Sequence, residues 1–163
     1  MKFSERAPGC SDAPMNVPFR VSRRVEFCDT DAAGIAHFSV FFLYMEQSEH
    51  ELLRQLGLSV VHRDDEGLIS WPRVQASCQY EGSVKFEDVL EITVHIDRLG
   101  ERSVSYAFDF VHDGRRIAAG KTTAVCCRVQ PGGGLRSIPI PEWMAGKLRE
   151  FMQINSEPLN NEQ

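Results

Sequence analysis

The sequence predicts an α+β fold in which one antiparallel sheet of five strands wraps around a single long helix. Three observations lead to this fold class. Five segments alternate apolar and polar residues, as strands with one buried face do. One long segment, residues 39–56, has helical length and a nearly continuous apolar first half. This helix follows the first strand, so a sheet with one apolar face can cover it.

The first strand is expected at residues 19–27, where apolar and polar side chains alternate. The residues on its apolar face are Phe19, Val21, Val25 and Phe27. The long helix is expected to begin at Ser39, whose side chain suits an N-cap, and to end before Gly57. Because its first half is apolar nearly all round, we expect that half to be enclosed on most sides.

Four further strands are expected at residues 72–80, 89–97, 103–112 and 117–129, followed by a short helix at residues 141–152. Their apolar faces consist of Leu90, Ile92, Val94 and Ile96; then Val104, Tyr106, Phe108 and Phe110; and then Ile117, Ala119, Val125, Cys127 and Val129. Asp113-Gly114 predicts a tight hairpin between the last two long strands. One sheet on one helix leaves a strand edge exposed, so we expect a dimer that covers this edge.

Composition sets the class of protein. A chain of 163 residues with 42% hydrophobic content suits one domain, expected at residues 18–152 between a flexible arm (1–17) and a flexible tail (153–163). Five cysteines without a Cys-x-x-Cys pair favour reduced thiols in a cytoplasmic protein and argue against a zinc site. No apolar run follows Met1-Lys2, and none reaches ~20 residues, so we expect neither a signal peptide nor a membrane span. A net charge of -5 with scattered basic residues argues against nucleic-acid binding.

The residues that could carry chemistry gather between the first strand and the long helix. Asp29 and Asp31 lie in a short turn there, and Gly34 lets the backbone bend. The free N–H groups of a helix start form an anion site, so a carboxylate facing it suits acyl chemistry. Asp29 is interpreted as a turn residue and Asp31 as the reactive carboxylate. His37, just before the helix, is a candidate for substrate contact.

Other patterns are weaker. Glu46 and His50 face the same way on the helix, but two ligands do not make a metal site. No Gly-x-Ser-x-Gly elbow is present, which argues against a serine hydrolase of that kind. Arg98 and Arg102 flank a turn, where they either face solvent or contact a phosphate. The residues alone leave these two readings of the arginines open.

Residues 27–35, Phe-Cys-Asp-Thr-Asp-Ala-Ala-Gly-Ile, resemble the Asp-x-Asp-x-x-Gly motif of the hotdog-fold acyl-CoA thioesterases. The nearest branch is the 4-hydroxybenzoyl-CoA thioesterase family with its YbgC-like members. The resemblance continues through the end of the long helix at residues 52–58 and through residues 86–90, and it covers roughly residues 19–145. It implies a hotdog fold and hydrolysis of a small-molecule CoA thioester by a homodimer or homotetramer, with no metal and no cofactor.

The resemblance also implies roles for particular residues. Asp31 matches the catalytic carboxylate, as nucleophile or general base, and a backbone N–H near Phe38 matches the oxyanion donor. Arg102 matches a position that contacts the CoA phosphates, and Arg98 lies nearby. Gly34 belongs to the motif. The side chains in places comparable to the family's pocket lining are His37, Phe38 and Trp71.

Two other functions remain open at this point. A hotdog dehydratase would need a histidine paired with a helix carboxylate, and His37 with Glu46 are the candidates for that pair. A module that only binds acyl-CoA or an acyl-carrier protein would not need Asp31. The acyl group, short, long or aromatic, is also left open by the sequence.

Overall fold

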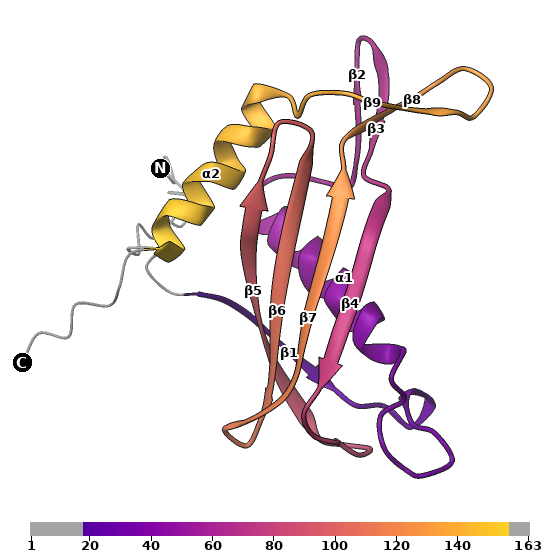
Figure 1. Ribbon diagram of the computed structural model, residues 1–163, viewed down its shortest axis with the longest axis vertical. Coiled ribbons are helices and arrows are strands. Elements are labelled where there is room, and N and C mark those ends of the chain that lie inside the picture. Colours follow the sequence, from indigo (N-terminus) through magenta and orange to yellow (C-terminus); the bar gives the residue numbers. More distant parts are fainter. Residues whose placement is uncertain (1–17, 157–163) are drawn as a thin grey trace, which may run out of the picture.

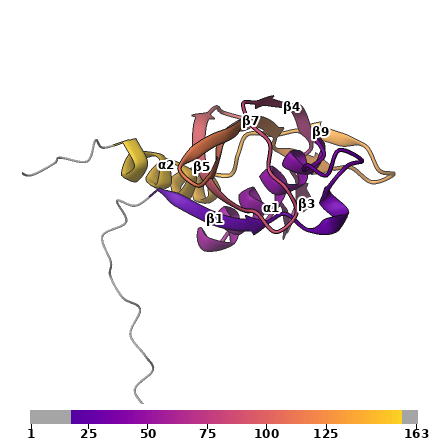
Figure 2. The same cartoon turned by 90° about the horizontal axis from the view of Figure 1, so that it is seen from below.

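The computed structural model describes residues 18–156, which form an antiparallel sheet wrapped around one helix (Figure 1). The sheet has five strands in the order β1-β5-β6-β7-β4. Their bounds are Phe19–Arg24 for β1, Arg73–Tyr80 for β4, Val89–Leu99 for β5, Ser103–His112 for β6 and Arg115–Val125 for β7. The helix α1, Val40–Gln55, lies in the concave side of this sheet (Figure 2). The predicted fold class is therefore confirmed.

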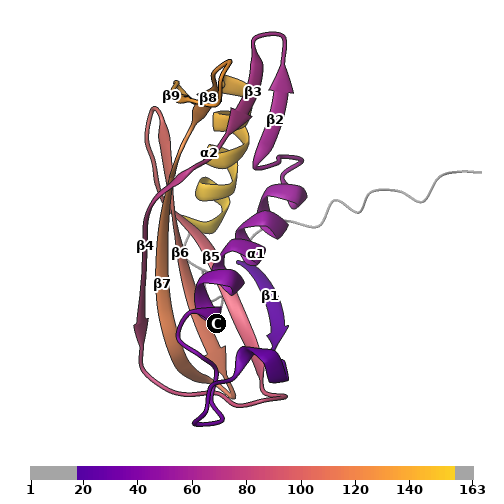
Figure 3. The same cartoon turned by 90° about the vertical axis from the view of Figure 1, so that its right-hand side faces the viewer.

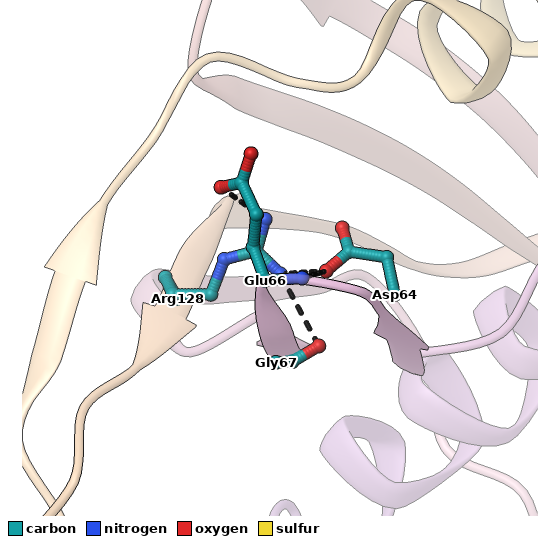
Figure 4. Close-up of polar contacts among 4 residues, drawn as sticks. All are labelled: Asp64, Glu66, Gly67 and Arg128. Atoms are coloured by element: carbon teal, nitrogen blue, oxygen red, sulfur yellow. Dashed lines mark hydrogen bonds and ion pairs between the residues drawn. The ribbon is translucent and has the colours of Figure 1, made fainter.

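A second, smaller sheet lies beyond one end of the first and was not predicted from the sequence (Figure 3). Its strands are β2 (Val61–Asp64), β3 (Gly67–Ser70), β8 (Cys127–Val129) and β9 (Leu135–Ser137). Arg128 of β8 is buried and donates hydrogen bonds to Asp64, Glu66 and the Gly67 carbonyl (Figure 4). These bonds hold the β2–β3 hairpin onto β8, because an arginine buried here must be paired.

The strands bury the faces predicted for β5 and β6. Of the face predicted for β7, Ile117 is buried, but Ala119 and Val125 are only partly buried. The inward residues of β7 are Ala118, Gly120, Thr122 and Ala124. They are small because α1 crosses the sheet there: a Cβ added to Gly120 would lie 2.2 Å from the Met45 sulfur. The prediction chose the larger odd-numbered residues, and the close approach of the helix explains why this was wrong.

The first strand is shorter than predicted. β1 ends at Arg24, and residues Phe27–Asp29 form a 3-10 turn, η1, instead of continuing the strand. The Asp29 carboxylate accepts a hydrogen bond from the Glu26 N–H at 2.9 Å and thereby closes this turn. As a result Phe27 is 77% exposed rather than part of the core.

The last helix, α2, spans Glu142–Ser156 and packs against β5. It continues beyond residue 152, where the sequence analysis placed its end. The Lys147 ammonium donates to the Leu56 carbonyl at 2.9 Å and so stabilises the end of α1, where Gly57 adopts φ +64°. No helix within residues 18–156 is long and apolar enough to cross a membrane. The predicted arm (1–17) and most of the predicted tail lie outside the described residues.

Candidate active site

The candidate site is the loop that joins η1 to α1, residues 29–38. Its two ends are hydrogen-bonded to each other. The His37 N–H donates to the Asp29 carbonyl at 2.8 Å, and the Asp31 N–H donates to the Ile35 carbonyl at 2.9 Å. The Ala36 N–H donates to the Val84 carbonyl at 2.8 Å, which fixes the loop to the segment before β5. This closed loop places Asp31 opposite Ile35, in the segment that leads into α1.

Asp31 lies at the tip of this loop and is half-buried. Its Oδ1 atom accepts a hydrogen bond from the Ala33 N–H at 2.8 Å, which forms an Asx turn. Gly34 has φ +74°, a conformation that suits glycine and completes the turn. Within the described residues the Oδ2 atom of Asp31 has no hydrogen-bond partner. One carboxylate oxygen therefore fixes the turn while the other is available for chemistry.

Asp29 has a different environment. Its Oδ2 atom accepts hydrogen bonds from the Tyr44 hydroxyl at 2.7 Å and from the Glu26 N–H at 2.9 Å. Burial and the adjacent Asp29 carboxylate raise the pKa of Tyr44, so this hydroxyl is protonated at neutral pH. These contacts agree with the interpretation of Asp29 as a turn residue.

The start of α1 presents a free donor. In the part of the chain that the structure describes, no acceptor receives the Phe38 N–H. The Phe38 carbonyl accepts a hydrogen bond from the Tyr80 hydroxyl at 2.8 Å, while the Phe38 side chain is 60% exposed. The Nδ1 atom of His37 lies 2.7 Å from the Ser39 Oγ atom. Ser39 is at the N-cap, but its side chain contacts His37 instead of capping the helix.

A buried ion pair near the middle of α1 was not predicted. Glu49 is 1% exposed, and its Oε2 atom accepts a hydrogen bond from Arg73 at 2.7 Å. Burial outweighs the attraction of Arg73 and raises the pKa of Glu49 to about 7. Sequence reasoning missed it because the second half of α1 reads as polar, and only the fold places one of its carboxylates inside.

The remaining candidates lie at the other end of the molecule. Trp71, between β3 and β4, lines a small cavity with Glu49 and Tyr106, beside the C-terminal half of α1. Arg98 and Arg102 flank the β5–β6 turn, at the end of the sheet opposite the 29–38 loop (Figure 1). Arg102 is half-exposed, and its guanidinium lies 3.4 Å from the Ser137 carbonyl and 3.6 Å from the exposed Glu101 carboxylate.

The separation along the sheet follows from the strand register. Arg24 at the end of β1 pairs with Val89 at the start of β5, and Arg98 lies near the end of β5. At about 3.3 Å per residue the two ends of this strand are roughly 30 Å apart. Within one chain, therefore, Asp31 and Phe38 belong to the same hydrogen-bonded loop, whereas Trp71, Arg98 and Arg102 lie apart from that loop.

The described residues, 18–156, contain no group of three or more His, Cys, Asp or Glu side chains that could hold a metal ion. The groups that the 29–38 loop offers for chemistry are the Asp31 carboxylate and the free backbone N–H of Phe38 before α1. This pairing suits the attack of water or of a carboxylate on a carbonyl carbon, with the oxyanion held by the N–H.

Comparison with known proteins shows the family of this chain. Residues 25–148 match the thioesterase-like superfamily, so the chain belongs to that superfamily of hotdog-fold proteins. A protein of Aquifex aeolicus (strain VF5), provisionally named as an esterase, is 32% identical over 123 residues, which cover 76% of this chain and 93% of that protein.

Two further relatives have more specific names. A 1,4-dihydroxy-2-naphthoyl-CoA hydrolase of Synechococcus elongatus (strain ATCC 33912 / PCC 7942 / FACHB-805) is 24% identical over 140 residues, covering 85% of this chain and 98% of that protein. The solved structure of a gentisyl-coenzyme A thioesterase matches with a TM-score of 0.67 and 27% identity, covering 79% of this chain and 98% of that one. In both cases the matched region covers nearly the whole length of the relative, so the likeness extends over a complete domain.

Proposed function

We propose that this protein hydrolyses a CoA thioester to a free acid and CoA. The observation that carries the proposal is the arrangement of the 29–38 loop. It combines a carboxylate that has one unengaged oxygen, on Asp31, with an unbonded N–H at a helix start, on Phe38. The names of the relatives support a CoA thioester as the substrate.

Two routes are compatible with this arrangement. In one, the Asp31 carboxylate attacks the thioester carbonyl, CoA leaves as its thiolate and takes up a proton, and water then hydrolyses the mixed anhydride. In the other, Asp31 takes a proton from a water molecule as that water attacks the same carbon. In both routes the carbonyl oxygen gains negative charge, which the Phe38 N–H and the positive end of α1 would stabilise. The neighbouring His37 ring would line the site.

The dehydratase alternative lacks support in the structure. His37 contacts Ser39 at the start of α1, whereas Glu46 is exposed two turns further along the helix. The described residues show no contact between these two side chains. The alternative of a module that only binds its ligand is tested directly by the Asp31 substitution described below.

We also propose that two copies pair through β4. This strand is an edge of the five-stranded sheet, most of its residues are exposed, and Val74 is 65% exposed. Pairing about a two-fold axis with antiparallel β4 strands would bring the Trp71 end of one chain to the Asp31 end of the other. Such a dimer offers one account of why the candidate residues lie at opposite ends of a single chain.

Replacement of Asp31 by asparagine tests the function. Asp31→Asn keeps the shape of the side chain but removes its charge, so kcat should fall by about a hundredfold or more while the protein remains folded. The assay follows release of free CoA thiol from a panel of aromatic and aliphatic acyl-CoAs. Asp65→Asn, in the exposed β2–β3 turn, is the matched control and should behave as wild type. Near-normal turnover by Asp31→Asn would rule out the mechanism.

Sedimentation or light scattering tests the pairing. We expect no stable monomer at micromolar concentration. Val74→Lys places a charge on the exposed β4 edge and should shift the protein toward monomer without unfolding it. A wild-type species of one chain, folded and active, would contradict the proposed dimer.

A further inference from the structure

The chain contains three tyrosines, and two of them hold the candidate loop by their hydroxyl groups. The Tyr44 hydroxyl donates to Asp29 at 2.7 Å, and the Tyr80 hydroxyl donates to the Phe38 carbonyl at 2.8 Å. We infer that Tyr44 and Tyr80 are positioning residues that hold the Asp31 carboxylate and the Phe38 N–H in their working geometry. This inference rests on the proposed function, because it assigns how that site is kept in place.

Tyr44 holds the first end of the loop. Its side chain is buried, so its hydroxyl reaches Asp29 from inside the domain. Within residues 18–156 the other acceptor near this hydroxyl is the Arg24 carbonyl at 3.5 Å, so the shorter bond to the carboxylate dominates. The Asp29 carbonyl accepts the His37 N–H, which joins the two ends of the loop that carries Asp31. A shift of Asp29 would therefore displace both ends of this loop.

Tyr80 holds the second end. It is the last residue of β4, and its ring packs against Phe41 of α1 with centroids 5.3 Å apart. Its hydroxyl binds the carbonyl of Phe38, the residue whose own N–H is free. Because the Phe38 side chain is 60% exposed, packing of that side chain does little to orient its backbone. The bond from Tyr80 holds the peptide plane between Phe38 and Ser39, which adjoins the plane that carries the free N–H, and so restricts rotation of the Phe38 backbone.

Both hydroxyls act as donors, and both remain protonated near neutral pH. Burial is the main cause that raises the pKa of Tyr44 and of Tyr80, the latter to about 12. Their loss should therefore lower the height of the pH–rate profile of kcat without moving its limbs. A tyrosine that transferred a proton to the substrate would instead remove a limb.

The test uses phenylalanine substitutions, which remove only the hydroxyl. Tyr44→Phe and Tyr80→Phe should each lower kcat by about tenfold with KM changed less than about twofold, since misplacement of reacting groups slows the chemical step. Tyr106→Phe is the matched control. Tyr106, on β6, is also buried, but it lies near Glu49 and the second half of α1, away from the 29–38 loop. Its replacement should therefore leave kcat unchanged.

The inference is overturned if kcat of both variants stays within about twofold of wild type, if the change is in KM alone, or if Tyr106→Phe lowers kcat as much. Because Tyr44 is buried, the unfolding midpoint of each variant is measured as well. The exposed Tyr80 provides the test even if Tyr44→Phe does not fold. The intact Tyr80→Phe protein should retain its fold because only a surface hydroxyl is removed.

Amide hydrogen exchange gives a second readout that does not depend on turnover. The N–H groups of Asp31 and His37, which are bonded within the loop, should exchange several-fold faster in Tyr44→Phe and Tyr80→Phe than in wild type. Unchanged exchange would refute the inference. If the wild type hydrolyses no thioester but these N–H groups exchange faster in the tyrosine variants, the proposed function fails. The conclusion that the two tyrosines hold the loop in place is then still supported. If Asp31→Asn is inactive and the tyrosine variants are normal, only the inference fails.

Discussion

Replacement of the buried Glu49 by glutamine should change how the stability of this protein depends on pH. In the folded chain this carboxyl is 1% exposed, is bonded to Arg73 and has a pKa of about 7, above its ordinary value of 4.5. Burial is the larger influence and Arg73 offsets only part of it. The folded chain therefore holds the proton of Glu49 more tightly than the unfolded chain does.

The sign and size of the effect follow from this difference. The stability that the raised pKa contributes is fully present below about pH 4.5 and is lost as the pH rises through about 7. At about 1.4 kcal/mol for each pKa unit, the loss is about 3 kcal/mol. Glu49→Gln keeps an oxygen that can accept from Arg73 but carries no charge. Arg73 itself remains 24% exposed and can stay hydrated.

The assay is urea unfolding of wild type and Glu49→Gln at fixed protein concentration between pH 4.5 and pH 8. The free energy of unfolding of the wild type, relative to that of the variant, should fall by about 3 kcal/mol across this range. Glu150→Gln, at an exposed position of α2 and not among the charges that shift the pKa of Glu49, is the matched control and should follow the wild type. Parallel curves for wild type and Glu49→Gln would refute the reasoning, as would a variant that is much less stable at pH 8.

Two other substitutions test the ligand contact and the packing. Arg102→Ala should raise KM for an acyl-CoA several-fold with little change in kcat, because an exposed phosphate contact is modest and screened by salt. The rise in KM should shrink at high salt and vanish for a short thioester without the nucleotide. An equal loss of activity with both substrates would show that the residue is structural. Gly120→Ala should lower the free energy of unfolding in urea by about 1–3 kcal/mol, because the new Cβ would meet the fully buried Met45 sulfur. Gly146→Ala is the control, because there is open space around the Gly146 Cα. Equal effects of the two substitutions would contradict the packing argument.

The sequence was sufficient to predict the sheet, the long helix and the loop that carries Asp31, because each depends on local periodicity or on turn-forming residues. It did not predict the second sheet, since its strands are short and are held by Arg128, a residue far along the chain from Asp64. The buried face of β7 was missed for a similar reason. There the close approach of α1 favours Gly120 over larger residues, which reverses the usual link between size and burial.

The candidate site also depends partly on local sequence and partly on contacts with distant elements. Local sequence indicates Asp31, because an Asx turn and a glycine at positive φ are short-range features. The placement of the loop depends on contacts from three distant elements: the Tyr44 hydroxyl, the Tyr80 hydroxyl and the Val84 carbonyl. None of these contacts has a periodic signature in the sequence.

The dependence of the loop on distant contacts matters for the chemistry of the site. The carboxylate and the oxyanion donor belong to one short segment, but a thioester hydrolase needs them fixed relative to each other to within a fraction of an ångström. The loop's internal bonds join Asp29 to His37 and Asp31 to Ile35, so they set its shape but not its orientation against the sheet. That orientation comes from the Val84 carbonyl and, by our inference, from the tyrosines on α1 and β4. Because β4 is also the exposed edge proposed to pair with a second copy, dimer formation and the position of the Phe38 N–H depend on the same strand.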